Sequence, residues 1–481
     1  MGDESLNGRL RRLTQNSKRQ TQNSFAMDLY SELALLLGSD VVSRDQAKLE
    51  ENSHDKWFAS HLPDVVVEPT CTEQISCLLR FASRWQIPVT ARGAGYGYVG
   101  GCVPAKGGIA LSLARMNRIK EIAAADGVTV VEPGVITGDL QREVKNCRLF
   151  YPPDPASVKN CSIGGNIATN AGGPRCLKYG VTRHYVLGLE VVLANGTVVR
   201  VGGRTHKNKT GFDLVGLFVG SEGMLGIVTE ATLRLLPFPP ARASISSSFR
   251  SIEDAATAVL EILLEGYLPS ALEIADRFTL EAARQHLADR IVPEGDAHLL
   301  IDVDGHEAPV RSEIEALSRL VKSLGALTLE CAFGEGPCEK LWDLRRGFSE
   351  SLKATGLTKL NEDVAVPRGK LVELMRFAGD LRDRYGFPVA CFGHAGDGNI
   401  HVNVMVADPT NPEVGQKVER ALDDLFQYVI ASGGTITGEH GIGLAKKRWW
   451  SQAVSRESIE LHQTVKRALD PGGILNPGKF L

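Results

Sequence analysis

The segment Ala91-Arg-Gly-Ala-Gly-Tyr-Gly97 places three glycines within five positions, directly after residues 87–91, whose pattern is typical of a strand. Glycine adopts positive φ angles and lets the backbone approach a ligand closely. Successive free N–H groups then form a concave site for an anion such as a pyrophosphate. No good helix pattern follows, so the segment matches a Rossmann or Walker loop poorly. Taken alone, it is also compatible with a plain turn.

Two further glycine-rich segments follow along the chain. They are Cys161-Ser-Ile-Gly-Gly-Asn-Ile-Ala-Thr-Asn-Ala-Gly-Gly173, which is preceded by Tyr151-Pro-Pro-Asp-Pro-Ala-Ser157, and Gly220-Ser-Glu-Gly-Met-Leu-Gly-Ile-Val228. Each is compatible with ordinary loop structure. Because the set of three is far more specific than any one member, we interpret the segments together as a long cradle for one extended cofactor.

Strand and helix patterns alternate between residues 70 and 240. A helix is predicted over 71–86, with Ile75, Leu78, Leu79 and Ala82 on one face, and strands over 63–69, 87–91, 128–132, 188–193 and 197–201. Ala194-Asn-Gly196 is a strong hairpin signal between the last two strands. Pro237-Phe-Pro-Pro240 interrupts this pattern, and we place the first domain boundary there.

A different pattern follows the proline cluster. Strands are predicted over 244–249, 299–303 and 327–331, and helices over 253–265, 309–324 and 413–431. The last helix has the cleanest amphipathic spacing of the three. This region therefore resembles an antiparallel sheet covered by helices.

A histidine-containing strand is predicted within Gly393-His-Ala-Gly-Asp-Gly-Asn-Ile-His-Val-Asn-Val-Met-Val406. From residue 399 onward, alternation places Val402, Val404 and Val406 on one face and His401, Asn403 and Met405 on the other. The glycine-rich turn after His394 can fold that residue back toward His401. For either histidine alone, a hydrogen-bonded structural role is the alternative.

A second polar loop, Thr435-Ile-Thr-Gly-Glu-His-Gly-Ile-Gly443, supplies Glu439 and His440 side by side. If the loop is extended, the two side chains point in opposite directions, so one can bind a metal while the other faces a substrate. Two imidazoles and one carboxylate suit Zn²⁺ or a similar divalent ion with an open position.

A helix is predicted around residues 341–352, with an apolar stripe on one face. Arg345 and Ser349 are four residues apart and are therefore neighbours on an adjacent face. Arginine presents a planar fork that binds a carboxylate through two hydrogen bonds. An ordinary surface arginine is the alternative, and Arg346 is expected to face solvent.

The composition is that of a soluble globular protein of two to four domains, with 481 residues of which 43% are hydrophobic and 23% charged. The formal charge of −3 gives no electrostatic reason to expect nucleic acid, and no apolar run of 18 residues predicts a transmembrane helix. Residues 1–24 are polar and basic without an apolar core, so we expect a mobile tail rather than a targeting peptide, and a cytoplasmic protein. The nine cysteines contain no CxxC pair, which argues against a disulfide framework or an iron–sulfur cluster.

The three glycine-rich segments resemble the flavin domain of the vanillyl-alcohol oxidase / p-cresol methylhydroxylase (PCMH) superfamily. Residues 45–481 resemble its D-2-hydroxyacid dehydrogenase branch, which contains D-lactate, glycolate and D-2-hydroxyglutarate dehydrogenases. The resemblance implies an α+β fold with four parts. These are an N-terminal tail and short helix over 1–44, a two-subdomain PCMH-type FAD-binding domain over 45–240, a ferredoxin-like cap over 241–430, and a C-terminal segment over 431–481 that returns to the flavin.

The resemblance also implies the cofactor contacts. Around the FAD pyrophosphate it places Arg92, Gly93, Ala94, Gly95, Tyr96 and Gly97. Along the dinucleotide and flavin it places Pro153, Asp154, Ser162, Gly165, Asn166, Thr169 and Gly172. Three further residues are also expected at the cofactor: Gly223, Ile227 and Asn476. Members with a histidyl–flavin bond near the first loop often have histidine at the position of Tyr96, so we expect FAD to be bound without that bond. Tyr96 and Tyr98 stand where the branch commonly has Thr and Leu.

By the same resemblance, the metal ligands are His394, His401 and Glu439, and the substrate residues are Arg345, Ser349, Asn361 and Asn403. We hypothesise that a D-2-hydroxyacid is oxidised to its 2-oxoacid by hydride transfer to the flavin. The metal would bind the hydroxyl and the carboxylate, and His440 would act as general base. Asn361 lies near the position of a lysine in the hydroxyglutarate enzymes, which favours D-lactate or glycolate over D-2-hydroxyglutarate.

The expected partners are a small hydroxyacid, a second copy in a homodimer, and an external electron acceptor. That acceptor would be an electron-transfer flavoprotein, a quinone, a cytochrome or an iron–sulfur subunit, and it could hold the protein at a membrane surface. Two alternatives stay open at this point. A metal-dependent hydrolase would use the same ligand set but leaves the cradle unexplained. A flavoprotein subunit that mainly docks a partner would have little activity alone.

Overall fold

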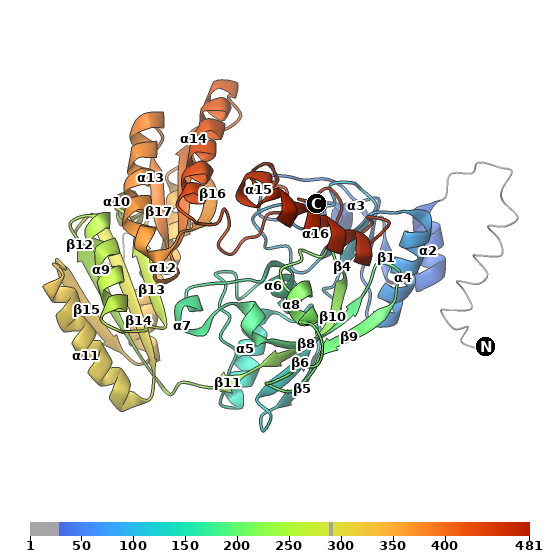
Figure 1. Cartoon of the computed structure of the whole chain (residues 1–481), viewed down its shortest axis with the longest axis horizontal. Helices are drawn as coiled ribbons and strands as arrows, with labels where there is room; N and C mark the ends of the chain where they lie inside the picture. The colour runs from blue at the N-terminus through green and yellow to red at the C-terminus, as the bar shows by residue number, and fades with distance from the viewer. Residues whose placement is uncertain (1–27, 288–291) are drawn as a thin grey trace, which may run out of the picture.

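The computed structural model describes residues 28–287 and 292–481, and the tail predicted at residues 1–24 lies outside these residues. The described chain forms two bodies (Figure 1). A four-stranded sheet, a five-stranded sheet, a two-stranded sheet and the C-terminal helices build the first, and a seven-stranded sheet with its helices builds the second. We refer to residues 241–431, from the first strand of that sheet to its last helix, as the cap.

The first sheet has the order β1-β2-β4-β3, and β4 pairs in parallel with β2 and β3. Its elements are α2 (Leu29–Leu37), β1 (Val42–Ser43), α3 (Gln46–Glu51), β2 (Val65–Val67), α4 (Thr72–Trp85), β3 (Val89–Arg92) and β4 (Ile109–Ser112). The four apolar residues expected on one face of the helix over 71–86 are buried in α4 and belong to the same core cluster as α2 and these strands. The helix therefore forms where its apolar stripe can be buried.

The second sheet is antiparallel, with the order β5-β6-β10-β8-β9. Its strands are β5 (Ile119–Ala123), β6 (Val128–Val131), β8 (Val186–Val192), β9 (Val198–Gly202) and β10 (Ile227–Arg234), and around it lie α5 (Thr137–Asn146), β7 (Leu149–Phe150), α6 (Ile163–Thr169), α7 (Cys176–Tyr179), η1 (Thr182–Tyr185), α8 (Leu214–Phe218) and β11 (Leu236–Pro237). The turn at Asn195 and Gly196 joins β8 to β9 in an antiparallel hairpin, as the sequence predicts.

The cap sheet is antiparallel throughout, with the order β15-β12-β14-β13-β17-β18-β16. Its elements are β12 (Ala241–Phe249), α9 (Ile252–Leu264), β13 (Ala271–Ala275), α10 (Arg277–His286), β14 (Ala297–Gly305), α11 (Glu307–Ser323), β15 (Thr328–Phe333), α12 (Glu335–Ala354), β16 (Thr358–Ala365), η2 (Arg368–Lys370), α13 (Leu371–Tyr385), β17 (Val389–His394), η3 (Ala395–Asp397), β18 (Asn399–Val406) and α14 (Pro412–Ala431). The strands β12 to β15, with α9 and α11, form the expected ferredoxin-like unit. The sheet is larger than that unit, because β13 pairs with β17 and adds three strands.

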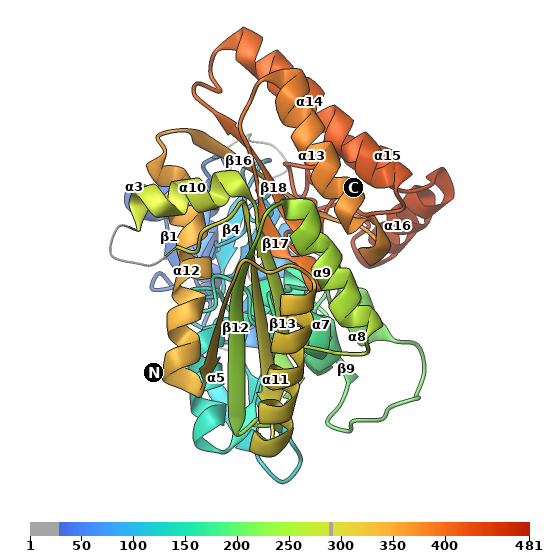
Figure 2. The same cartoon turned by 90° about the vertical axis from the view of Figure 1, so that its left-hand side faces the viewer.

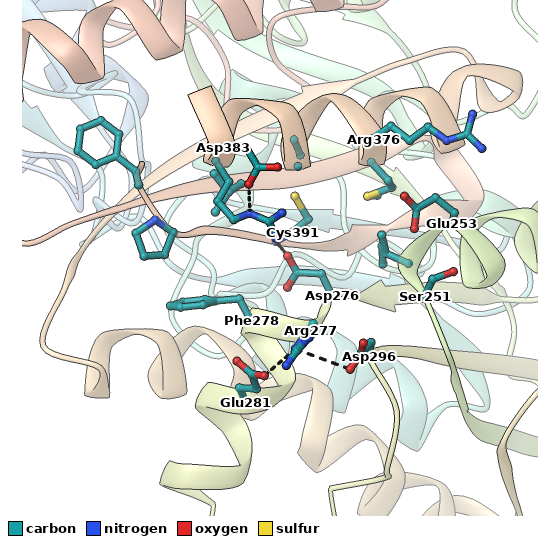
Figure 3. A pocket seen from close by; sticks show the side chains of 18 of the residues that line it. Ser251, Glu253, Asp276, Arg277, Phe278, Glu281, Asp296, Arg376, Asp383 and Cys391 are labelled. Atoms are coloured by element: carbon teal, nitrogen blue, oxygen red, sulfur yellow. Dashed lines mark hydrogen bonds and ion pairs between the residues drawn. The ribbon is translucent and has the colours of Figure 1, made fainter. Parts of the chain in front are cut away.

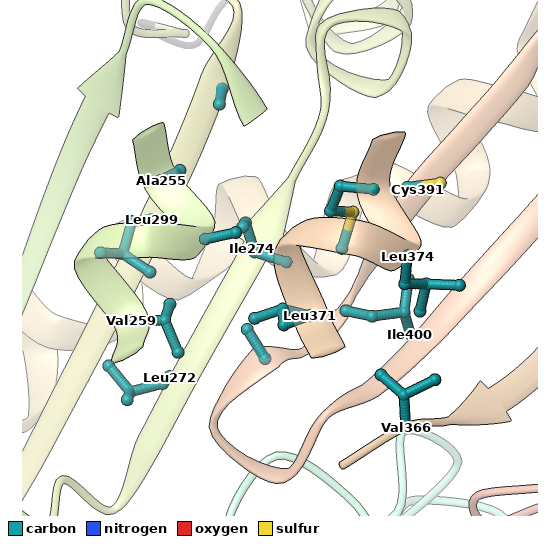
Figure 4. Packing of buried hydrophobic residues seen from close by; sticks show 14 of the residues in the cluster. Ala255, Val259, Leu272, Ile274, Leu299, Val366, Leu371, Leu374, Cys391 and Ile400 are labelled. Atoms are coloured by element: carbon teal, nitrogen blue, oxygen red, sulfur yellow. The ribbon is translucent and has the colours of Figure 1, made fainter. Parts of the chain in front are cut away.

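The two faces of the cap sheet differ in what covers them. One large apolar cluster packs α9, α11, α13 and α14 on one face, where Ile274, Leu371 and Leu374 meet (Figure 4). Figure 2 shows α10 and α12 on the opposite side of the sheet from α9 and α11. Val402, Val404 and Val406 belong to the large cluster, so alternation turns His401 and Asn403 toward the face of α10 and α12.

The C-terminal end returns to the first body through α15 (Lys447–Ala453) and α16 (Arg456–Leu469), as Figure 1 shows in red. Leu475 forms a parallel bridge with Val89 of β3, and the Lys466 ammonium donates to the Met224 and Leu475 carbonyls. Within residues 28–287 and 292–481, no helix is long and apolar enough to cross a membrane.

Leu374 is fully buried between α13 and the cap sheet, so Leu374→Ala should remove packing that the site face depends on. We expect a loss of about 2–5 kcal/mol in the stability of the cap, measured as a lower denaturation midpoint in urea. Leu264→Ala is the matched control, because Leu264 is 78% exposed and its truncation should change the midpoint little. Equal midpoints for the two variants would contradict this account of the core.

Candidate active site

A cavity of about 590 Å³ is lined by glycine-rich loops of the first body and by side chains of α12 in the cap. Of the residues predicted to contact a cofactor or substrate, it is lined by Arg92, Gly93, Ala94, Gly95, Tyr96, Gly97, Gly165, Asn166, Thr169, Gly172, Gly223, Ile227, Ser349, Glu439 and His440. Its lining does not include Pro153, Asp154, Ser162, Asn476, Arg345, Asn361, Asn403, His394 or His401. The fold thus brings the three predicted cradle segments to one cavity.

The cavity wall depends on glycine at two positions of the first loop. A Cβ atom on Gly93 would lie 2.5 Å from the Ser162 hydroxyl, and one on Gly95 would lie 2.0 Å from the Arg92 guanidinium. Gly95 also has a φ of 73°, which side chains disfavour. Ser162 is buried behind this wall, where its hydroxyl accepts from the Gly165 N–H and caps α6. A side chain at either position would displace the wall itself, so the loop presents backbone to the cavity, which fits the close approach of an extended dinucleotide.

Three residues predicted along the cofactor are held by other parts of the chain. The Pro153 carbonyl accepts from the Gln141 amide, and Asp154 pairs with Arg175 at 3.2 Å. Asn476, in the left-handed region with a φ of 44°, donates to the Gly101 and Glu222 carbonyls. The Asn476 amide oxygen is buried and has no hydrogen-bond partner among the described residues.

His394, His401 and Glu439 form one compact cluster. His394 ends β17, His401 lies in β18, and Glu439 comes from the loop after α14. The Glu439 Oε1 atom lies 3.7 Å from His394 Nε2 and 3.5 Å from His401 Nε2, and one ligand atom from each residue falls within 4.8 Å of the others. Tetrahedral ligands at about 2.0–2.2 Å from Zn²⁺ are roughly 3.3–3.6 Å apart. The donor set and its spacing therefore fit a divalent ion.

The two histidines have opposite electrostatic surroundings. Burial lowers the pKa of both, but at His394 the neighbouring carboxylates of Glu273 and Glu439 together outweigh burial and raise its pKa. At His401 burial prevails over the charges of Glu439 and Asp363, and the pKa falls to about 3. His401 is therefore a neutral imidazole at ordinary pH, which is the form that binds metals.

The Glu439–His440 loop is held by two buried carboxylates that the sequence analysis did not identify. Asp363 Oδ2 accepts from the backbone N–H groups of Gly438, Glu439 and His440 at 2.8–3.0 Å. On the other side of the loop, Glu222 accepts from the backbone N–H groups of residues 442 and 443 at 2.7 and 2.9 Å. Asp363 belongs to the cap and Glu222 to the first body, so this loop joins the two.

His440 lies between the ligand cluster and the cavity. Its Nε2 atom is 3.8 Å from Glu439 Oε1, and its Nδ1 atom is 3.9 Å from Asp363 Oδ2. Its ring stacks on Tyr98 at 5.3 Å and on His401 at 5.6 Å between centroids. Tyr98, which departs from the branch pattern, thus covers a face of His440.

The predicted substrate residues lie on the same side of the cap sheet. Arg345 Nε donates to Glu273 at 2.6 Å, and Ser349 accepts from the Lys359 ammonium at 2.7 Å. Asn403 donates to the Ala390 and His401 carbonyls. The amide oxygens of Asn361 and Asn403 are buried and have no partner among the described residues. Arg346, expected to face solvent, is partly exposed and also lines the cavity.

Lys359 is a partly buried cation at this site. Burial, together with the nearby charge of Lys353, lowers its pKa to about 8. Its ammonium contacts the neutral Ser349 hydroxyl rather than a carboxylate. Asp363 and Glu273 were not predicted. The period of two along β16 gives a signal for Asp363, because it places Asp363 on the same face as Lys359 and Asn361.

A second hollow of about 840 Å³ lies on the cap between α10 and α13, and Figure 3 shows its charged rim. Two ion pairs lie in its lining: Arg277 with Glu281 at 2.7 Å, and Arg382 with Asp383 at 2.8 Å. Asp276 at its base caps α10 and accepts from the Cys391 N–H. None of the predicted site residues lines it.

The sequence comparisons match two family models. Residues 63–202 match the FAD binding domain, and residues 238–480 match the C-terminal domain of FAD linked oxidases. The chain is 40% identical over 419 residues to a glycolate oxidase subunit GlcD from Bacillus subtilis, covering 87% of this chain and 89% of the relative. It is 37% identical over 418 residues to a D-lactate dehydrogenase from Archaeoglobus fulgidus, covering 87% of this chain and 91% of that relative.

Solved structures share the fold. p-Cresol methylhydroxylase with substrate bound matches with a TM-score of 0.76 at 20% identity, covering 94% of this chain and 96% of that structure. 4-Ethylphenol oxidase from Gulosibacter chungangensis matches with a TM-score of 0.75 at 21% identity, with the same coverage. The expected PCMH-type FAD-binding fold is therefore confirmed.

Replacement of Asp363 by Asn should loosen the loop at residues 438–440, because the amide group presents N–H donors where three backbone donors need an acceptor. A charge-assisted hydrogen bond contributes about 1.5–3 kcal/mol, so we expect roughly 10- to 100-fold faster amide hydrogen exchange at these residues. Asp276→Asn is the control, since it alters a carboxylate that caps α10 and does not contact this loop. Unchanged exchange at 438–440 in Asp363→Asn would contradict the role given to Asp363.

Proposed function

The chain belongs to the FAD-linked oxidases, and from this premise we propose that it oxidises a small D-2-hydroxyacid, with D-lactate or glycolate favoured, to the 2-oxoacid. The observation that carries this proposal is the buried His394, His401 and Glu439 cluster with His440 between it and the cavity. A metal-dependent hydrolase would leave the FAD-binding domain without a role, so we do not propose it.

FAD would lie along the cavity against the loop over 92–97, the α6 segment over 165–172, and Gly223 and Ile227. When bound, it supplies the acceptor for the two electrons removed from the substrate. We propose non-covalent binding, since Tyr96 occupies the position of the histidine that carries flavin in related proteins. Lys56 lies over the Tyr96 ring at 4.6 Å, which keeps this side chain against the wall.

A divalent ion, with Zn²⁺ favoured, would be held by His394, His401 and Glu439. When bound, it supplies positive charge that favours the ionised form of a substrate hydroxyl. His401 contributes a neutral imidazole, and the Glu439 carboxylate is stabilised in its charged form by His394, which together with the other histidines lowers its pKa against the effect of burial.

His440 would accept the hydroxyl proton at Nε2, the nitrogen that faces the ligand cluster. The Asp363 carboxylate, 3.9 Å from Nδ1, would stabilise the imidazolium that results. Tyr98 covers the ring and limits its contact with water. This arrangement keeps the proton acceptor close to, but separate from, the metal ligands.

Arg345 would bind the substrate carboxylate, with Ser349, Asn361 and Asn403 as further polar contacts. The neutral Asn361 supports a short acid. Lys359 is the nearby, partly buried cation that a second carboxylate would reach, so D-2-hydroxyglutarate stays in the set of substrates to test.

Reoxidation would use an external acceptor: an electron-transfer flavoprotein, a quinone, a cytochrome or an iron–sulfur subunit. All nine cysteines are free thiols, and the described residues hold no cysteine cluster for such a centre. We propose a cytoplasmic location, a membrane contact through the acceptor, and a homodimer. One relative is a glycolate oxidase subunit, which supports a second candidate function, a flavoprotein subunit with little activity alone.

Anaerobic addition of D-lactate, L-lactate, glycolate and D-2-hydroxyglutarate to the purified, metal-replete protein tests the proposal through the visible flavin spectrum. Bleaching by D-lactate or glycolate but not by L-lactate is expected. Bleaching by D-2-hydroxyglutarate alone would move the substrate to the dicarboxylic acids. A yellow protein that no acid bleaches would favour the second candidate function, a flavoprotein subunit with little activity alone. A colourless protein would contradict the proposal.

His440→Ala should slow flavin reduction by about 10²- to 10⁴-fold, because a general base is lost, while the flavin content stays normal. Stopped-flow absorbance of anaerobic flavin reduction measures this rate. His462→Ala on α16 is the control, since His462 packs against Trp450 and belongs neither to the cavity lining nor to the ligand cluster. A near-normal rate in His440→Ala would remove this residue from the role of base.

Metal removal should abolish turnover reversibly. Treatment with a chelator is expected to lower kcat strongly, and added Zn²⁺ should restore it in the unaltered protein. In His401→Ala one of three ligands is missing, so the same Zn²⁺ should fail to restore activity and elemental analysis should find less bound metal. Full activity after complete metal removal would exclude the metal from the reaction.

A further inference from the structure

Glu273 is a fully buried carboxylate to which neither the sequence analysis nor the proposed function gives a role. It lies in the middle of β13, on the sheet face that carries the ligand cluster. In the antiparallel pairing of β13 with β17 it stands directly opposite His394. The residues beside it in β13 are apolar, so nothing in that strand compensates its charge.

Both carboxylate oxygens of Glu273 are used, and each contacts a different part of the site. Oε1 lies 2.7 Å from His394 Nδ1, and Oε2 accepts from Arg345 Nε at 2.6 Å. The Arg345 guanidinium also lies 4.9 Å from the centre of the Phe392 ring. One side chain therefore connects a candidate metal ligand to the candidate substrate arginine.

The contact with His394 decides which ring nitrogen is free. A carboxylate only accepts, so the proton of His394 is held on Nδ1. On binding a metal, Nε2 would give up its proton and present its lone pair on the side of Glu439, 3.7 Å from Oε1. A carboxylate behind a histidine fixes the tautomer and ring orientation that metal binding requires.

The contact with Arg345 decides which edge of the guanidinium is free. Nε is taken by Glu273, whereas the terminal nitrogens make no other hydrogen bond to the described residues. Those terminal N–H groups remain as an edge that can bind a carboxylate through two hydrogen bonds. The ring of Phe392 restricts rotation of the guanidinium about this contact.

We propose that Glu273 is a positioning residue that orients His394 for metal binding and Arg345 for the substrate carboxylate, so that one buried group sets both. This inference rests on the proposed function. It predicts that a single substitution weakens metal binding and acid binding together, although the two sites use different residues.

A purely structural role is the rival explanation, because the pair of Glu273 and Arg345 also ties α12 to the sheet. Asp302 offers a matched control for that role. It is a buried carboxylate of the adjacent strand β14, and it bonds to Arg242 Nε at 2.8 Å and to Trp342 of α12 at 3.2 Å. It contacts none of the candidate ligands.

Glu273→Gln keeps the size of the side chain but can accept through only one oxygen. With the purified flavoprotein and no substrate present, equilibrium dialysis against Zn²⁺ should show a dissociation constant raised by about 10- to 100-fold, with normal flavin content. KM for the best acid should rise by about tenfold or more, because a charge-assisted bond that orients Arg345 is lost. Asp302→Asn should lower stability but leave the Zn²⁺ dissociation constant and KM unchanged.

The outcomes separate the inference from the proposed function. If the unaltered protein binds no Zn²⁺, the proposed metal site fails first. If it binds Zn²⁺ and Glu273→Gln binds it equally well, or if Asp302→Asn weakens binding as much, the positioning role is overturned. Should Glu273→Gln not fold, Glu273→Asp keeps the charge but is one methylene too short to reach both partners, and it should still weaken Zn²⁺ binding.

Discussion

The site depends on the hydrogen bonds that Asp363 accepts from the backbone of the loop carrying Glu439 and His440. Asp363 is fully buried, and burial alone would raise its pKa; the neighbouring His440 and Lys446 side chains together with these hydrogen bonds hold that pKa well below its usual range. A charged acceptor in the interior fixes three successive N–H groups at once, which a flexible glycine-rich loop cannot do for itself. Glu222 holds the same loop from the first body, so the cap and the cofactor cavity meet at one place.

The remaining geometry follows from the strand register of the cap sheet and from the alternation of side chains between its two faces. Glu273 stands opposite His394, and Asp363 stands opposite His401, on adjacent antiparallel strands. Because side chains alternate between the faces, a register slip of one residue would turn these groups into the apolar cluster of α13 and α14. Packing on the apolar face therefore determines which side chains lie on the polar face. Because Val402 and its neighbours are buried in the apolar cluster, His401 must point to the opposite side of the sheet.

Much of this arrangement could be predicted from local pattern. The glycine segments, the hairpin after β8, the apolar stripe of α4 and the alternation along β18 each depend on residues within a few positions of one another. The size of the cap sheet could not be predicted in this way, because the pairing of β13 with β17 joins strands more than a hundred residues apart. For the same reason Glu273 was missed: its strand reads as an ordinary buried segment, and its partners lie 72 and 121 residues away.

By itself, then, the sequence determined the helices and strands and the kinds of side chain that they carry. These include a glycine-lined cradle, two histidines at and after one glycine-rich turn, and an arginine on a helix. These follow from short-range sterics and from the period of apolar residues. Only the tertiary structure decided which buried carboxylate contacts which histidine, arginine or loop. Strand order and register bring Glu273 to His394 and Arg345, and Asp363 to the loop of His440, because buried charges are tolerated only where the fold supplies a partner.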